Sequence, residues 1–468
     1  PPPLDPAGNR RALIRLLGVL AGLSLLVGLT QSALALHFVY ETDRAYSPKQ
    51  WLVVGLILAW PMLLGWGVLL RWAWWRVVAG VAAYFVLITP VVLLASNEAQ
   101  TLQAVFALYG LYAAIPLGIV LLIGASGQVR AVAPYLLPVF LGLLSASHVG
   151  LEALTRATSG AIATWPQGLK GLIATLGAQP TIALFALAPW LLAAWPVYRL
   201  GRWLAEAYRR KRYSDLIYLF AAYWLLVLFT GALMGLAGTG WPALWQVLAW
   251  AWLPLGFFLL RRWLAPAVPA PTLLVLRVFG RDAAVAALFD RVVERWRLTG
   301  NTLLIAGTDL ASRTLDPDDL FVFLNGRLAQ RFVPSAEAIP RHVAALDLAP
   351  DPDGRFRVNE LHCFDTTWQP TLRALVELSD VVLMDLRGFQ AENAGCRFEL
   401  RVLAGAPHLQ RVVLLRDAQT DRAAAQAEIA AVPAGRFVWL DAGRLDGGVA
   451  RRVLRALFAA DRPATNPV

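Results

Sequence analysis

The sequence SDVVLMDLRGFQAENAGCRFEL, residues 379–400, combines a strand pattern, a loop and a helix that carries a carboxylate. Its apolar run at 381–384 has the length and composition of a buried strand. The run ends at Asp385, and after a loop the next segment predicts a helix that contains Glu399. In an open α/β sheet, ligands bind outside the carboxyl ends of the strands. We therefore expect Asp385 and Glu399 to share one crevice at the edge of such a sheet.

The segments around this stretch alternate between strand and helix patterns. A stiff linker rich in Pro and Ala occupies 263–271 and precedes them. Further strands are expected at 272–279, 302–306, 411–415 and 437–440, and helices at 283–297, 316–328, 365–378 and 448–459. The turn sequence Asp351-Pro352-Asp353-Gly354 predicts a hairpin between 342–348 and 355–363. Such alternation indicates an α/β domain over 272–462, with a mainly parallel sheet, helices on both faces and a tail at 463–468.

The first half of the chain has the composition of a membrane protein. The 468 residues are 58% hydrophobic and include 19 Trp, which favours membrane interfaces. Their mean hydropathy is +0.56. A helix needs about 20 apolar residues to cross a bilayer. Eight such spans are expected, at 13–36, 51–70, 75–96, 104–124, 131–150, 179–198, 216–237 and 243–260. We therefore predict a polytopic membrane domain over 1–262, with an interfacial helix in the connection at 151–179.

The surplus of positive charge belongs to this membrane domain. Residues 1–262 contain 18 Lys and Arg against 7 Asp and Glu, whereas residues 263–468 contain 24 of each kind. Because the second half is neutral, we expect no nucleic acid as a partner. With the N-terminus inside, 14 of the 18 cations lie in inside segments. We therefore expect a multi-pass protein of the bacterial inner membrane with both ends, and the α/β domain, in the cytoplasm.

The inside connection 199–216, RLGRWLAEAYRRKRYSDL, is strongly basic. This composition is typical of topology determinants that contact anionic lipids. The alternative interpretation is a docking surface for the α/β domain or for a nucleotide. The expected spans themselves contain almost no charged residues, which favours an anchor, sensor or oligomerisation module over an ion-coupled transporter.

Two blocks of the second half resemble the Toll/interleukin-1 receptor (TIR) domain family, whose sheet is flavodoxin-like. In that family a strand and polar loop precede a helix with a small residue, Cys and Glu-Leu, which Gly395, Cys396, Glu399 and Leu400 match. The segment LRVFGRD at 276–282 resembles the opening box of the family. The block around Glu399 is also similar to nucleoside 2-deoxyribosyltransferases. The sequence departs from the TIR pattern at 385–387, where a serine is usual, and at 334–365, which is longer.

Both families place a glutamate beside the anomeric carbon of a ribose. The resemblance therefore implies that Glu399 is catalytic in hydrolysis of the N-glycosidic bond of NAD or a related nucleotide, with Asp385 assisting. The implied nucleotide-binding residues are Arg277, Phe279, Gly280, Arg281, Arg387, Asn393 and Gly395. Each of these residues also has a purely structural interpretation. Glu399 would be an acid that favours the first turn of a helix, Asp385 would cap a loop, and Cys396 would be a small buried residue.

Three functions remain open from the sequence. The first is a membrane-anchored TIR-like effector in signalling or antiviral defence that hydrolyses NAD when its domains cluster as a homo-oligomer. The second is a non-enzymatic assembly or ligand-binding module coupled to a membrane sensor or pore. The third is a transporter or channel with a regulatory α/β domain. We expect membrane lipids as partners, NAD only as a substrate, and neither a cofactor nor a metal site.

Overall fold

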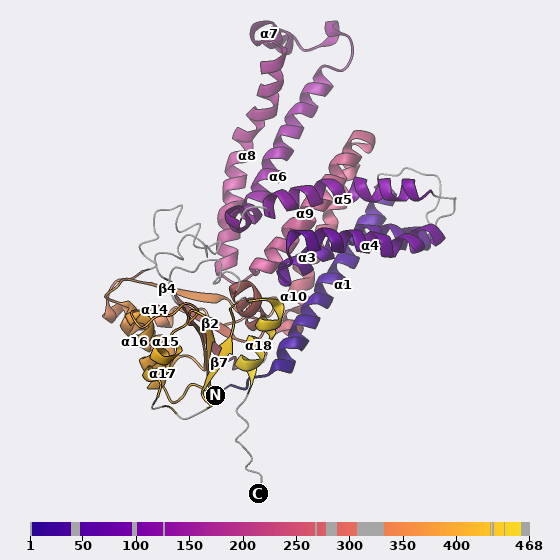
Figure 1. Ribbon diagram of the computed structural model, residues 1–468. Coiled ribbons are helices and arrows are strands. Elements are labelled where there is room, and N and C mark those ends of the chain that lie inside the picture. The colour runs from indigo at the N-terminus through magenta and orange to yellow at the C-terminus, as the bar shows by residue number, and fades with distance from the viewer. Residues whose placement is uncertain are drawn as a thin grey trace.

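The computed structural model describes residues 2–38, 47–95, 101–124, 127–266, 269–277, 288–306, 332–430, 432, 435–443 and 445–459. Helices occupy the chain up to residue 264, and an α/β domain follows (Figure 1). The helices of the first part are α1 (Pro6–Phe38), α2 (Pro48–Leu58), α3 (Met62–Leu69), α4 (Trp74–Ala95), α5 (Leu102–Gly124), α6 (Gly127–Ala157), α7 (Gln167–Leu176), α8 (Ala178–Arg209), α9 (Asp215–Thr239), η2 (Trp241–Ala251) and α10 (Trp252–Leu264).

Seven helical segments in the described residues are long and apolar enough to cross a membrane. They are Pro6–Phe38, Pro48–Leu69, Trp74–Ala95, Leu102–Leu121, Ala178–Arg209, Asp215–Leu233 and Trp241–Leu264. They correspond to seven of the eight expected spans and confirm a multi-pass helical membrane region. The other expected span, 131–150, is also helical and lies in α6, but α6 is not among the seven. The helix expected in the connection at 151–179 is present as α7.

Small residues allow neighbouring helices of this region to pack closely. A Cβ atom at Gly28 in α1 would lie 2.6 Å from the backbone oxygen of Gly55 in α2. A Cβ atom at Gly150 in α6 would lie 1.9 Å from the backbone oxygen of Phe185 in α8. Such close backbone approach is typical of helix pairs in membranes. Figure 1 shows α6 and α8 paired along their length, with α7 at the far end of the hairpin.

The α/β domain contains a seven-stranded sheet in the order β3-β4-β2-β1-β5-β6-β7. Every pair of neighbouring strands is parallel. The strands are β1 (Thr272–Arg277), β2 (Asn301–Ala306), β3 (Phe332–Val333), β4 (Val358–Cys363), β5 (Val381–Asp385), β6 (Arg411–Arg416) and β7 (Phe437–Asp441). The expected strands near 272, 302, 381, 411 and 437 are therefore all present, because each is a continuous apolar run of the kind that parallel sheets bury on both faces.

Helices cover both faces of this sheet. On one face, α15 (Trp368–Glu377), α16 (Ala394–Ala404) and α17 (Arg422–Glu428) share a core with Leu274 and Met384 of the strands. On the other face, α12 (Glu294–Trp296) and α18 (Gly447–Phe458) share a core with Leu273 and Leu383. This arrangement confirms the α/β class, the parallel sheet and the two helical layers.

The expected hairpin between 342–348 and 355–363 is wrong. Residues Ile339–Ala344 form helix α14, and β4 pairs in parallel with β2 and β3. The tight turn itself exists, since the backbone N–H of Gly354 donates to the oxygen of Asp351 at 2.9 Å. A turn sequence specifies only a local reversal of the chain and does not choose the strand that β4 joins. The edge strand β3 and helix α17 were not expected, and the helix expected at 316–328 lies outside the described residues.

Candidate functional site

The chain switches from one half of the sheet to the other between β1 and β5. Strands β2, β4 and β3 lie on one side of β1, and β5, β6 and β7 lie on the other. Ligands of open α/β sheets bind outside the carboxyl ends of the strands at such a switch point. Arg277 ends β1, Asp385 ends β5, and the two residues are register partners. Two of the expected site residues therefore lie at the topological switch point.

Asp385 is bound by an arginine two residues later. The Nε and Nη2 atoms of Arg387 donate to the two oxygens of the Asp385 carboxylate at 2.8 and 2.5 Å. The Nη1 atom of Arg387 donates to the backbone oxygen of Ala442 at 3.4 Å. This bidentate pair ties the end of β5 to the segment after β7. Asp385 and Arg387, which the resemblance assigned to substrate, thus bind each other in the described structure.

Glu399 is the most perturbed carboxyl group at this end of the sheet. Its side chain lies in α16 and is 6% exposed. Burial raises the pKa of Glu399 from its ordinary value of 4.5 to about 8, and Arg277 offsets this effect only in part. Its Oε2 atom is buried and accepts no hydrogen bond from the described residues. Burying such a group costs free energy, and perturbed carboxyl groups concentrate at functional sites.

A favourable helix-dipole contact does not account for Glu399. Helix α16 begins at Ala394, so Glu399 lies beyond the first turn, where the dipole effect has faded. The residue instead points into the buried side of α16, together with Cys396 and Leu400. Its position is therefore an energetic cost to the fold rather than a gain.

Asp385 and Glu399 are carried by elements associated with opposite faces of the sheet, and their shared crevice at the strand ends stays a prediction. Side chains alternate along a strand, so Asp385 points to the same face as Leu383, which packs with α18. Helix α16 and Glu399 cover the face on which Met384 lies. The spacing of two residues along the chain does not determine which face the following helix covers. In the described structure, Arg277 is the charged residue that acts on Glu399.

The remaining expected site residues divide into two groups. Phe279, Gly280 and Arg281 lie outside the described residues. Asn393 precedes α16, and its side-chain oxygen accepts a hydrogen bond from the backbone N–H of Gln390 at 2.7 Å. Gly395 is in the first turn of α16. These two residues therefore shape the start of the helix that carries Glu399.

The described cysteines have the properties of unreactive thiols. Burial raises the pKa of Cys396 to about 12, and Glu399 adds to this effect. Burial also raises the pKa of Cys363. A thiol in this state is protonated at neutral pH and is a poor nucleophile. Among the described residues, no group of three His, Cys, Asp or Glu side chains is arranged to hold a metal ion.

Ionisation of Glu399 predicts how stability depends on pH. Because its folded pKa of about 8 exceeds 4.5, the folded state holds the proton more tightly, and stability falls as the pH rises from about 4.5 through 8. Each pKa unit corresponds to about 1.4 kcal/mol, so the loss is on the order of 5 kcal/mol. We expect the Tm of a Glu399→Gln variant, relative to wild type, to increase between pH 5 and pH 9 in a thermal scan in detergent. A difference that stays constant with pH would contradict the raised pKa.

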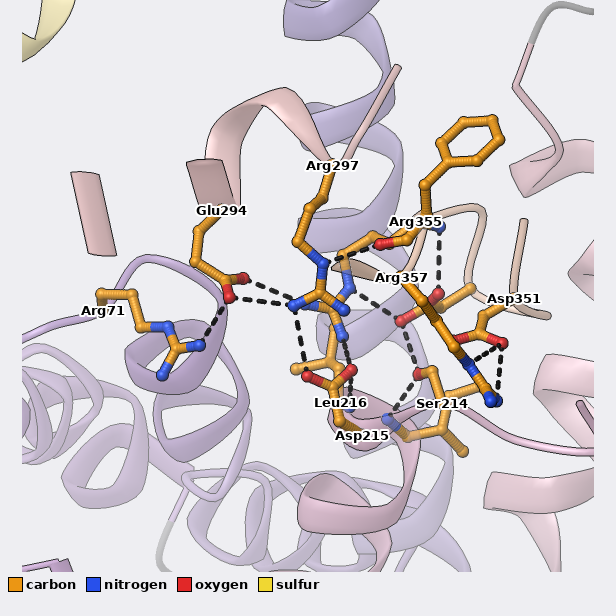
Figure 2. A network of polar contacts seen from close by, with 12 residues as sticks. Arg71, Ser214, Asp215, Leu216, Glu294, Arg297, Asp351, Arg355 and Arg357 are labelled. Atoms are coloured by element: carbon orange, nitrogen blue, oxygen red, sulfur yellow. Dashed lines mark hydrogen bonds and ion pairs between the residues drawn. The ribbon is translucent and has the colours of Figure 1, made fainter. Parts of the chain in front are cut away.

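A second polar cluster lies at the opposite, amino edge of the sheet, where the α/β domain meets the membrane helices (Figure 2). We call it the junction network. It contains four arginines and four carboxylates, so its formal charges balance. They are Arg71, which follows α3; Asp215, at the start of α9; Glu294 and Arg297, before β2; and Asp351, Asp353, Arg355 and Arg357, before β4.

Glu294 and Arg355 are the centres of the junction network. The Oε1 atom of Glu294 accepts from Nη2 of Arg71 at 2.6 Å and from Nη1 of Arg297 at 2.9 Å. Arg355 binds Asp215 through Nη2 and Asp353 through Nε, the latter at 2.9 Å. One carboxylate from the α/β domain thus holds an arginine of the membrane part, and one arginine from the α/β domain holds an aspartate of the membrane part.

Further contacts join the start of α9 and the end of α8 to the same segment. The hydroxyl of Ser214 donates to Asp353 at 2.6 Å and caps α9 by accepting from the backbone N–H of Ile217 at 3.1 Å. Arg357 lies over the ring of Tyr208 at 4.0 Å and donates to the backbone oxygen of Tyr208 at 2.7 Å. Polar contacts therefore join the start of α9 and the end of α8 to the segment at 351–357.

Gly354 brings this turn against the end of α10. Its φ angle is +81°, and a Cβ atom there would lie 2.2 Å from the backbone oxygen of Leu264. Only glycine combines this left-handed conformation with such a close approach at little cost. The DPDGRFR segment at 351–357 was the available signal for this contact, but its turn residues predicted a hairpin instead.

Electrostatics favours the ionised form of Glu294, whereas burial opposes that of Asp351. Burial raises the pKa of Glu294, but Arg297, Arg71 and Arg355 together lower it to about 2. Burial raises the pKa of Asp351 to about 6 despite the opposing effect of Arg357. Removing one partner from a buried ionic network leaves an uncompensated charge. We therefore expect the junction network to hold the two parts of the protein in a single arrangement.

Comparison of the chain with protein-family models, with curated proteins and with solved structures gives no match. The function is therefore inferred from the geometry of the switch point and of the junction network.

Proposed function

We propose that the protein is a membrane-anchored, TIR-like signalling or defence effector whose α/β domain hydrolyses the N-glycosidic bond of NAD or a related nucleotide. The observation that carries this proposal is Glu399, a buried carboxyl group with a raised pKa that interacts with Arg277 at the switch point. The order β2-β1-β5-β6-β7 supports it, because this is the 2-1-3-4-5 order of flavodoxin-like sheets. Strands β3 and β4 are then additions at one edge.

The chemistry of the proposal requires the charged form of Glu399. Cleavage of an N-ribosyl bond passes through an oxocarbenium-like transition state, which a nearby carboxylate stabilises. With a pKa of about 8, Glu399 is mainly protonated at neutral pH. The positively charged nicotinamide ring of NAD favours its ionisation. The guanidinium group of Arg277 suits a pyrophosphate oxygen. Substrate binding thus converts Glu399 to the form that the reaction uses.

Contacts at the N-terminus support a topology with both ends on one side of the membrane. The side-chain nitrogen of Asn9 donates to the backbone oxygen of Arg295 at 2.6 Å and to the hydroxyl of Thr299 at 3.2 Å. The start of α1 thus adjoins the α/β domain, which requires an even number of crossings. We propose that α6 supplies the eighth. The bias of Lys and Arg supports a cytoplasmic α/β domain, and we propose the bacterial inner membrane as its location.

A second candidate function is supported by the junction network. A non-enzymatic module that couples a membrane sensor to a cytoplasmic ligand needs a defined connection between its parts, and the buried ion pairs from Arg71 to Glu294 and from Asp215 to Arg355 supply one. The transporter or channel has less support, because the described helices pack around a core of apolar side chains.

The proposal predicts release of nicotinamide from NAD by the purified full-length protein. We expect slow release by the protein in detergent and faster release after its copies are clustered, for example by a bivalent antibody against a terminal tag. Chromatography of the reaction measures nicotinamide directly. No release from either sample would overturn the hydrolase function and favour the coupling module.

A further inference from the structure

The C-terminal third of α8 carries two arginines that stack on aromatic rings of the same helix. The guanidinium carbon of Arg199 lies 4.8 Å from the ring centre of Trp195, and that of Arg202 lies 5.9 Å from the ring centre of Tyr198. We call Arg199 and Arg202 the stacked pair. Each arginine is four residues after its ring, so both point along the same face of the helix. At these distances each guanidinium group is attracted to the face of its ring by a cation–π interaction.

The stacked pair has no carboxylate partner among the described residues, unlike the next three cations, Arg209, Arg210 and Lys211. Arg209 and Arg210 both bind Glu206, at 2.5 and 2.6 Å. Lys211 binds Asp347 of the α/β domain. Both members of the stacked pair are exposed. The segment therefore presents two adjacent positive charges that no carboxylate in the described structure neutralises.

The rings beside these charges are positioned as in a membrane interface. Trp195 is 66% exposed, and Tyr198 and Trp203 are also exposed. Exposed aromatic rings next to arginines, at the end of an apolar helix, are typical of the headgroup level of a bilayer. An arginine over an exposed ring recurs at the ends of α1, α4 and α10 that adjoin the α/β domain, in the pairs Arg15 with Trp263, Arg76 with Trp75 and Arg261 with Phe258.

We propose that the stacked pair binds the phosphate of an anionic phospholipid headgroup. Guanidinium groups match phosphate oxygens with paired hydrogen bonds, and the rings of Trp195 and Tyr198 lie where the glycerol and acyl ester groups of a bilayer begin. A lipid satisfies the apolar rings and the charges together, whereas a free phosphate satisfies only the charges. The proposal is independent of catalysis by Glu399.

The stacked pair lies on the same helix as a residue that contacts the α/β domain. Tyr208, six residues after Arg202 on the same helix, holds Arg357 of the junction network through its ring and its backbone oxygen. A lipid that orders the end of α8 therefore stabilises the docked arrangement. The expected consequence is a protein whose thermal stability depends on anionic lipid.

Thermal unfolding of the full-length protein in detergent tests the proposal. We expect added phosphatidylglycerol to raise the Tm more than the same amount of phosphatidylcholine. We expect the Arg199→Gln/Arg202→Gln variant to need about tenfold more phosphatidylglycerol for the same shift, since each lost phosphate contact weakens binding. The matched control is Arg451→Gln/Arg452→Gln, which removes two exposed charges from α18 and should respond as wild type does.

Each outcome of this experiment decides the proposal. Equal responses to the two lipids, or an unchanged response of the α8 variant, would overturn it. A shift of equal size with inorganic phosphate or NAD that is lost in the α8 variant would also overturn it, because the ligand would then not be a lipid. If the α8 variant fails to fold, native mass spectrometry of the wild type replaces it. Retention of phosphatidylglycerol in preference to phosphatidylcholine supports the proposal, and no preference overturns it.

Discussion

The Glu399→Gln substitution is expected to lower NAD hydrolysis by about 10²–10³-fold while the protein stays folded. Gln has nearly the same shape as protonated Glu but cannot become negative, so it cannot stabilise the developing positive charge of the ribose. The magnitude is that of removing one well-placed electrostatic group from an active site. Nicotinamide release by clustered protein at saturating NAD measures the effect.

The same substitution should not destabilise the protein. The buried side chain already favours the neutral form, since its pKa is raised to about 8. A matched control is Glu392→Gln, which changes an exposed carboxylate in the loop before α16. We expect Glu392→Gln to retain wild-type activity. If Glu399→Gln retains it as well, Glu399 has no catalytic role and the coupling module becomes the better account of the domain.

Replacing Arg355 by Met is expected to lower the free energy of unfolding by about 3–5 kcal/mol and to release the α/β domain from the membrane helices. Arg355 binds Asp215 of α9 and Asp353 of its own turn, and its side chain is buried. The substitution leaves both carboxylates without this partner, which is the costly way to break a buried ionic network. A lower Tm and faster proteolytic cleavage in the linker at 263–271 would show both effects.

A double-mutant cycle distinguishes the loss of the ion pair between Arg355 and Asp353 from a general loss of packing. We expect Asp353→Asn to cost less stability in the Arg355→Met background than in the wild type, because the two residues share one interaction. Arg451→Met on α18 serves as the control for loss of an exposed arginine, and its Tm should change little. Additive costs for Arg355 and Asp353 would contradict the coupling of the two sites.

The local sequence predicted which segments of the α/β domain form strands and helices better than it predicted which strands pair with one another. The strands β1 and β5 were predictable because each is a continuous apolar run, and α16 because Cys396, Leu400 and Leu403 recur at helical spacing. The hairpin failed at Asp351–Gly354, since a turn reverses the chain without selecting a neighbouring strand. The shared crevice of Asp385 and Glu399 stays a prediction, because spacing along the chain leaves undetermined which face of the sheet the following helix covers.

The amino-acid sequence by itself determined the class of the protein. Long runs of apolar residues in the first 264 positions indicate membrane helices, and shorter runs after residue 271 indicate the strands of a parallel sheet. Both inferences need only the length and hydrophobicity of each run, which are properties of the local sequence, and the tendency of apolar groups to leave water. The tertiary structure alone decided that Asp385 binds Arg387 and that Glu399 is buried with Arg277. It also decided that Arg71 and Asp215 meet Glu294 and Arg355, since ion pairs depend on which distant segments the fold brings within a few ångströms.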